Sequence, residues 1–184
     1  MELKDFIKAM IENRINELHV ALPARIEEYN PRKLRATVTL LIKKELNGQM
    51  VQIPPIVECP VKVFKAGSFV IRPPYKKGDI VQVLFNERAL DRILISGNPE
   101  IIGFTRKHSL DDAVVIGGLR ADNAPELTAD NEDDLLILNT ETGSKMVMTQ
   151  AGKVQVIGST VELGGESGLS GVLLDDFRTW ILSH

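Results

Sequence analysis

The side chains best suited to acid–base or metal chemistry are scattered along this sequence. The three histidines, His19, His108 and His184, lie far apart, and Cys59 is the only cysteine. A catalytic or metal-binding motif needs such groups at short fixed spacings, and the sequence has no His-x-x-x-His, Cys-x-x-Cys, Gly-x-Ser-x-Gly or phosphate-loop pattern. The single cysteine also excludes an intrachain disulfide. We therefore expect a protein that is not an enzyme and that holds no cofactor.

Two acidic segments remain as candidate sites. Asp111 and Asp112 follow His108 closely enough to suggest a metal or acid–base site, but a solvated, capped turn accounts for them better. Residues 130–134 are acidic enough for calcium, but they lack the ligand spacing and the central glycine of an EF-hand loop. We interpret the first segment as a solvated, capped turn and the second as a disordered or solvated linker.

Charge divides the chain into two unlike parts. Residues 1–110 carry 18 basic and 12 acidic side chains, whereas residues 111–184 carry 4 and 13, so the net charges are +6 and −9. A strongly acidic segment is a poor ligand for nucleic acid. No apolar run approaches the roughly 20 residues of a membrane helix, and the N-terminus lacks the order of a secretion signal. We expect folding in a cytoplasm.

Residues 2–18 have the spacing of an amphipathic helix, and residues 1–19 form the first predicted segment. Apolar side chains recur at steps of three and four, on the face opposite the charged ones. This face needs a partner, which could be the chain's own barrel, sister chains or another protein. Attachment to a neighbouring protein would use Phe6, Ile7, Met10 and Ile11.

Residues 20–102 show short strands separated by turns. Alternation in Leu34–Ile42 and the turn signal Asn47-Gly48 are typical of antiparallel β-structure. Such spacing predicts a small closed barrel or a sandwich. The expected strands are Ala24–Glu28, Leu34–Ile42, Met50–Ile53, Val57–Phe64, Ser68–Ile71 and Ile80–Phe85.

Residues 103–134 are polar and turn-rich, which predicts a connector between two structures.

Residues 135–170 contain very short apolar strands joined by tight turns. One copy of such strands exposes most of its backbone groups and has open edges. Two packings solve this problem. Three chains can wind into an intertwined β-helix around a shared axis, or a meander can pack on its own barrel.

The trimeric alternative predicts an axial core from one phase of these strands, although Leu135 and Ile137 offer the opposite phase. Residues 171–184 then form a short C-terminal helix by their apolar spacing. The predicted core consists of Leu136, Leu138, Met146, Met148, Val154, Val156, Val161 and Leu163.

An ordered string of small motifs between Leu22 and Leu119 resembles the phage baseplate central spike family, the membrane-piercing needles of contractile tails with an N-terminal domain of the oligonucleotide/oligosaccharide-binding (OB) type, as in baseplate assembly protein V. The motifs are Leu22-Pro23-Ala24, Tyr29-Asn30-Pro31, Ala36-Thr37-Val38, Ile53 through Val61, Gly67 through Ile71, Pro73-Pro74, Lys77 through Val81, Val83-Leu84-Phe85, Glu87-Arg88, Asp91, His108 through Ala113 and Gly117-Gly118-Leu119.

The resemblance implies an all-β chain: an OB-type barrel after the N-terminal helix, then an intertwined trimeric β-helix and a C-terminal helix. Many such spikes end in a His-x-His pair that binds iron at the tip. This chain has no such pair and ends at Ser183-His184, so an iron site through His184 is not expected. A separate tip protein would then complete the spike.

The expected function is mechanical: a homotrimer in the tail baseplate, bound to hub and tube proteins, that punctures the host envelope without binding nucleic acid. The alternative is a carbohydrate- or nucleic-acid-binding OB module of a tail protein. That alternative requires a basic or aromatic strip on the barrel. Phe64, Phe69 and Phe85 occupy positions expected for core residues, which argues against such a strip.

Overall fold

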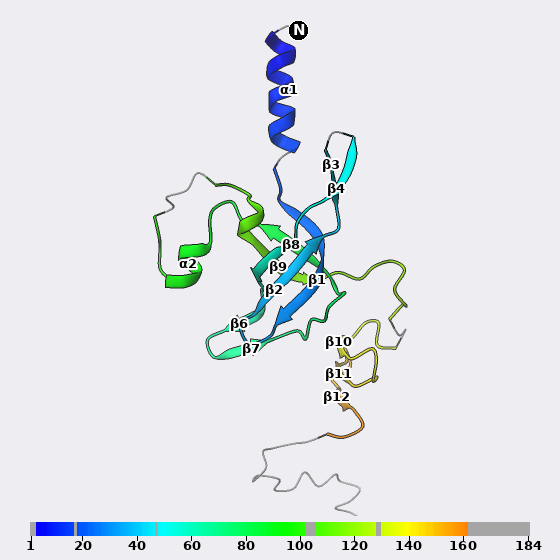
Figure 1. Cartoon of the computed structure of the whole chain (residues 1–184). Helices are drawn as coiled ribbons and strands as arrows, with labels where there is room; N and C mark the ends of the chain where they lie inside the picture. Colours follow the sequence, from blue (N-terminus) through cyan, green and yellow to red (C-terminus); the bar gives the residue numbers. More distant parts are fainter. Residues whose placement is uncertain (1–2, 17, 47, 102–105, 128–129, 162–184) are drawn as a thin grey trace, which may run out of the picture. The chain divides into compact units, whose positions relative to one another are not determined.

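The computed structural model describes residues 3–16, 18–46, 48–101, 106–127 and 130–161. These residues divide into two compact units, Met1–Ala124 and Pro125–His184. Strands dominate both units, and the helices are few (Figure 1). The expected all-β class is therefore confirmed.

The first unit is built on one curled antiparallel sheet with the strand order β5-β2-β1-β8-β9. Its strands are β1 (Ala21–Asn30), β2 (Arg35–Leu40), β5 (Ile56–Pro60), β8 (Ile80–Phe85) and β9 (Ala113–Gly118).

Alternation of side chains places one face of this sheet in the core. In β2 and β8 every second residue is buried, because successive side chains in a strand point to opposite faces. The concave face so formed is entirely apolar. The buried apolar cluster comprises Ala24, Ile26, Ala36, Val38, Leu40, Cys59, Val61, Val81, Val83, Phe85, Ala113 and Val115.

The two ends of the curled sheet meet. Val61, just after β5, forms a parallel bridge with Val115 of β9, and the Lys62 amide donates to the Val115 carbonyl at 2.8 Å. Contact between the first and last strands gives the sheet a barrel-like form, which fits the expected OB type.

Some strands begin and end where the sequence pattern predicts, and others do not. The strand Ile80–Phe85 has the bounds expected for it. By contrast, β9 lies inside residues 103–134, which the sequence presented as a connector, and it supplies the fifth strand of the sheet. Its two glycines and the polar turns beside it do not have the pattern of a strand, and its partner β8 is distant in sequence. The barrel boundary at residue 102 therefore moves to about the end of β9.

Two hairpins stand apart from the main sheet. β3 (Lys43–Leu46) pairs with β4 (Gln49–Gln52) across the expected Asn47-Gly48 turn, and β6 (Phe64–Ala66) pairs with β7 (Phe69–Ile71). Phe85 is buried, as expected. Phe64 and Phe69, however, are 78% and 81% exposed, so their expected core positions are wrong. Their strands have only three residues and pair only with each other.

A long connection between β8 and β9 carries α2 (Asp91–Ser96) and a 3₁₀ turn, Leu110–Asp112. Gly97 ends α2 in the left-handed conformation, with φ at 67°, which glycine adopts without steric cost.

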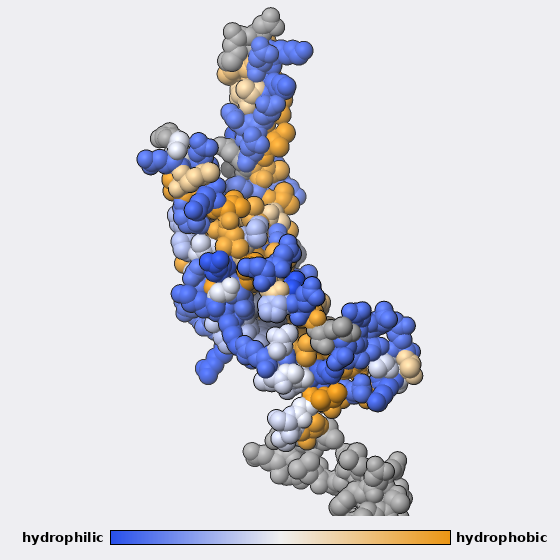
Figure 2. All heavy atoms as spheres, turned by 90° about the vertical axis from the view of Figure 1, so that its right-hand side faces the viewer, coloured by the Kyte–Doolittle hydropathy of each residue, from blue (hydrophilic) through white to orange (hydrophobic). Residues whose placement is uncertain are grey.

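The N-terminal helix, α1 (Leu3–Asn16), confirms the predicted amphipathic helix, and none of its residues is buried. Apolar side chains follow one side of it and polar ones the other (Figure 2). Within the described part of the chain, no helix is long and apolar enough to cross a membrane.

The second unit contains a three-stranded antiparallel sheet with the order β10-β11-β12. Its strands are β10 (Leu135–Leu138), β11 (Lys145–Met148) and β12 (Val154–Ile157). This confirms the short strands expected in residues 135–157. The expected C-terminal helix, residues 171–184, lies outside the described residues, as do Leu163 and His184.

Candidate functional site: the open face of the β10–β12 sheet

One face of the β10–β12 sheet is apolar and open to solvent. Cross-strand pairing aligns Leu135 with Met148 and Ile137 with Met146, and β12 continues both rows. Residues directly opposite each other in neighbouring strands share a face. All six side chains on this face are between 45% and 62% exposed, and we call them the open face: Leu135, Ile137, Met146, Met148, Val154 and Val156.

The reverse face is covered by its own chain. Val147, at the centre of β11, is fully buried. On the same face, the Lys145 ammonium donates to Asn131 Oδ1 at 3.1 Å, and Leu127 and Leu138 line a hollow with Lys145. The segment before β10 therefore packs on this face and leaves the other one bare.

The acidic segment at residues 130–134 has a structural task here. Asp134 Oδ1 accepts the Gln150 amide at 3.0 Å, and its Oδ2 accepts the Asn131 amide nitrogen at 2.9 Å. The Gln150 side chain donates to the Asp133 carbonyl at 2.8 Å. These bonds fasten the segment to the β11–β12 turn, so it is an ordered turn and not a disordered linker.

Two tight turns hold the strands in register. Asn139 Oδ1 accepts the amides of Glu141 and Thr142, and Gly143 takes a φ of 73°. In the second turn Thr149 Oγ1 accepts the Lys153 amide at 3.0 Å. Side-chain acceptors of this kind replace ladder bonds where the backbone reverses.

The predicted axial-core residues fall on both faces. Met146, Met148, Val154 and Val156 share the open face. Leu136 and Leu138 pair with Val147 and Lys145 and so lie on the covered face. Leu135 and Ile137 lie on the open face instead of Leu136 and Leu138. This is the opposite alternation of β10, which the sequence also allowed. Val161 is 46% exposed beyond β12.

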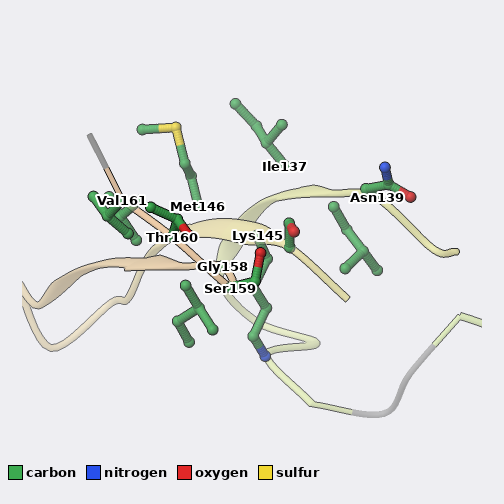
Figure 3. Close-up of a pocket in the computed structure, with 12 residues that line it drawn as sticks. Ile137, Asn139, Lys145, Met146, Gly158, Ser159, Thr160 and Val161 are labelled. Carbon is green, nitrogen blue, oxygen red and sulfur yellow. The ribbon is translucent and has the colours of Figure 1, made fainter. Parts of the chain in front are cut away.

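A hollow of about 500 Å³ lies beside the last residues of the sheet. In it Ile137 and Met146 project from the same side of the strands (Figure 3). Its described lining has hydroxyl and amide groups and one charged side chain, Lys145, without a carboxylate. Such a lining favours packing over acid–base chemistry.

The acidic candidates of the first unit take part in structural hydrogen bonds. Asp112 is buried, and its carboxylate accepts Nε and Nη2 of Arg106 at 2.8 and 2.9 Å and the Leu90 amide at 3.1 Å. Arg106 Nη2 also donates to Asp91 at 2.8 Å. These bonds, with Asp112 first, raise the pKa of Arg106 above its ordinary value. Sequence reasoning missed Arg106 because it is separated from Asp91 along the chain.

The other candidates are not brought together into a reactive site. Asp111 donates its amide to Ser109 Oγ at 3.3 Å, which is the capping role considered for it. His19 stacks at a tilt near Phe85, with 5.9 Å between ring centroids. No group of three or more potential metal ligands occurs among the residues that the structure describes.

The residues considered for attachment on α1 share one exposed stripe. Phe6, Ile7, Met10 and Ile11 are each about half exposed, and Met10 and Ile11 line a shallow apolar hollow with Ile15 and Leu18. The stripe remains available for a partner in the chain as described.

Comparison with protein families gives a match over most of the first unit. Residues 22–118 match the family described as Phage protein Gp138 N-terminal domain, which is more than half of the 184-residue chain. The match covers the whole curled sheet, from β1 through β9. No curated protein matches the chain. The chain therefore belongs to the Phage protein Gp138 N-terminal domain family, which makes it a phage protein and fits a structural component of the virion.

Proposed function

We propose that this protein is the homotrimeric central spike of a contractile tail baseplate. The observation that carries the proposal is the open face, six apolar side chains on one side of a small sheet whose other side is already covered. Three copies with these faces turned inward would form a dry axial core. Burial of apolar surface contributes roughly 25 cal/mol per Å².

The same arrangement resolves the free strand edges. Among the residues that the structure describes, β10 and β12 are the outer strands of the sheet, and no further strand pairs with their outer sides. Exposed edges of this kind pair readily with other chains. Edge pairing among three copies gives a continuous hydrogen-bonded shaft, and the stiffness of such a shaft is what puncture of an envelope requires.

The spike role needs no catalytic residue. Under this proposal the particle's contraction supplies the work, and the chain supplies rigidity. The α1 stripe (Phe6, Ile7, Met10 and Ile11) binds the baseplate hub at the tube end, since it is apolar and open.

The test compares two aspartate substitutions one residue apart on β12. Val156→Asp places three carboxylates in the proposed axial core, where unpaired charge is strongly unfavourable. Ile157→Asp changes a similarly exposed aliphatic residue on the opposite face, at 45% exposure against 51% for Val156. Native mass is measured by sedimentation equilibrium.

The wild-type chain and the Ile157→Asp variant are expected at three times 20.4 kDa. The Val156→Asp variant is expected as a monomer with its barrel still folded. A fully trimeric Val156→Asp variant would contradict the axial core, and a monomeric wild-type chain would remove the spike proposal altogether.

A further inference from the structure

The β6–β7 hairpin exposes apolar side chains on both of its faces. Pairing of Phe64 with Ile71 and of Ala66 with Phe69 puts Phe64, Phe69 and Ile71 on one face. Val70 lies on the other face and is also exposed. Figure 1 shows the hairpin extending from the curled sheet, and neither strand pairs with that sheet. The result is an apolar finger with its turn at Gly67 and Ser68.

The charged side chains in the hairpin segment itself are all basic. Residues 62–77 contain five basic side chains and no acidic one. Lys62 and Arg72 flank the two strands in sequence, and Lys65 pairs with Val70 within them. Lys77 lies 3.5 Å from Glu27 of β1. All five are exposed: Lys62, Lys65, Arg72, Lys76 and Lys77. An apolar tip thus stands within a basic collar.

The charge pattern selects the partner. A second copy of the same hairpin would bring Lys62, Lys65 and Arg72 against the same three cations, which opposes association. Single-stranded nucleic acid stacks on aromatic rings at one flat face and leaves aliphatic side chains in water. Here two aliphatic side chains, Val70 and Ile71, are exposed beside the rings, one on each face of the hairpin. Apolar side chains on both faces favour insertion into an apolar medium, and the basic side chains beside them favour an anionic surface on that medium.

We propose that the β6–β7 hairpin inserts into the interfacial region of an anionic lipid bilayer. Phe64, Phe69, Val70 and Ile71 would enter the boundary between headgroups and acyl chains, and the basic collar would contact the lipid phosphates. Membrane attachment strengthens when apolar burial and a polybasic patch act together. The inference concerns the barrel unit alone and does not depend on the spike proposal.

The test measures co-sedimentation of the full chain with vesicles. The wild-type chain is expected to bind vesicles of phosphatidylethanolamine and phosphatidylglycerol and to bind pure phosphatidylcholine vesicles far less. The double variant Phe64→Ser/Phe69→Ser is expected to lose about tenfold or more in binding, because it removes two side chains from the apolar phase. Lys62→Glu/Lys65→Glu is expected to lose the preference for anionic vesicles.

Ile95→Ser/Ile101→Ser is the matched control. These two aliphatic residues are 87% and 86% exposed but lie outside residues 62–77. Unchanged binding by this control, with loss in the phenylalanine variant, supports insertion by the hairpin. Equal loss in both variants, or no vesicle binding by the wild type, overturns it.

A second readout separates the alternative partner. Binding of a fluorescent single-stranded oligonucleotide that depends on Phe64 and Phe69, without vesicle binding, would replace the lipid by nucleic acid and refute the proposal. Native mass is recorded for every variant. A hairpin variant that keeps the wild-type mass but loses vesicle binding shows that its failure is separate from assembly.

Discussion

The residue pair that most constrains the barrel is Asp112 and Arg106. A buried carboxylate without a partner is costly, and Arg106 supplies two hydrogen bonds to it from the segment that ends the long β8–β9 connection. The same guanidinium reaches Asp91 at the start of α2. One side chain therefore links the start of α2 to the 3₁₀ turn that directly precedes β9.

We expect Arg106→Ala to lower the free energy of unfolding by about 3 kcal/mol, because it leaves the Asp112 charge buried with only the Leu90 amide. The double variant Arg106→Ala/Asp112→Asn should be less destabilised than Arg106→Ala alone, since no charge remains buried. Urea unfolding measures both. Asp91→Asn, which removes an exposed partner, is the control and should cost less than about 1 kcal/mol. Additive single effects would contradict the coupling.

Cys59 offers a second residue-level measurement. Burial raises the pKa of its thiol to about 11, although a backbone hydrogen bond at Val115 opposes the shift. Sγ donates to the Ala113 carbonyl at 3.2 Å. The folded thiol therefore stays protonated at pH values where the unfolded thiol, with a pKa near 9.0, has begun to ionise.

The raised pKa of Cys59 makes the stability of the fold depend on pH. The raised pKa favours the fold at pH below about 9, and this contribution is lost as the pH rises toward about 11. We expect a disulfide reagent to label Cys59 at pH 8 only as fast as the barrel opens, with full labelling in urea. Rapid labelling of the folded chain would show that the thiol is accessible.

At the scale of elements, the tight turns stabilise the β10–β12 sheet and thereby the open face. The β10–β11 turn depends on Asn139, whose Oδ1 accepts two backbone amides. A strand of four residues gives few ladder bonds, so each turn bond matters more than it would in a long hairpin.

We expect Asn139→Ala to cost about 1 kcal/mol, through the loss of these bonds. Hydrogen exchange should then accelerate in β10 and β11 while the amides of β1 and β8 keep their protection. Thr140→Ala, an exposed change in the same turn, is the control. Slower exchange or faster exchange spread evenly over both units would be inconsistent with a local role for this turn.

On the scale of the whole molecule, assembly and barrel folding belong to different units. The buried core of the first unit comes entirely from residues 24–115, within Met1–Ala124. A core of this kind does not require the second unit.

A chain ending at Ala124 is therefore expected to keep a β-type circular dichroism spectrum and to sediment as a monomer, while the full chain sediments as a trimer. Loss of cooperative thermal unfolding in the shortened chain would show that the barrel needs the second unit. A trimeric shortened chain would move the assembly contacts into the first unit.

The sequence by itself determined the periodic elements. Alternation in Arg35–Leu40 and Ile80–Phe85 specified strands with one buried face, and the spacing of apolar residues specified α1, because both patterns depend only on local backbone geometry. The order of motifs from Leu22 to Leu119 likewise pointed to the residues that carry the family match.

Only the tertiary structure decided which distant segments meet. The polar segment that contains β9 predicts a connector, and only its pairing with β8 makes it a strand of the sheet. Phe64 and Phe69 have the pattern of core residues, but their hairpin pairs apart from the main sheet. The phase of β10 was open for the same reason, since a four-residue strand fits either face until its partner fixes the register. Pairing and burial are set by contacts between residues far apart in the chain, which local periodicity does not encode.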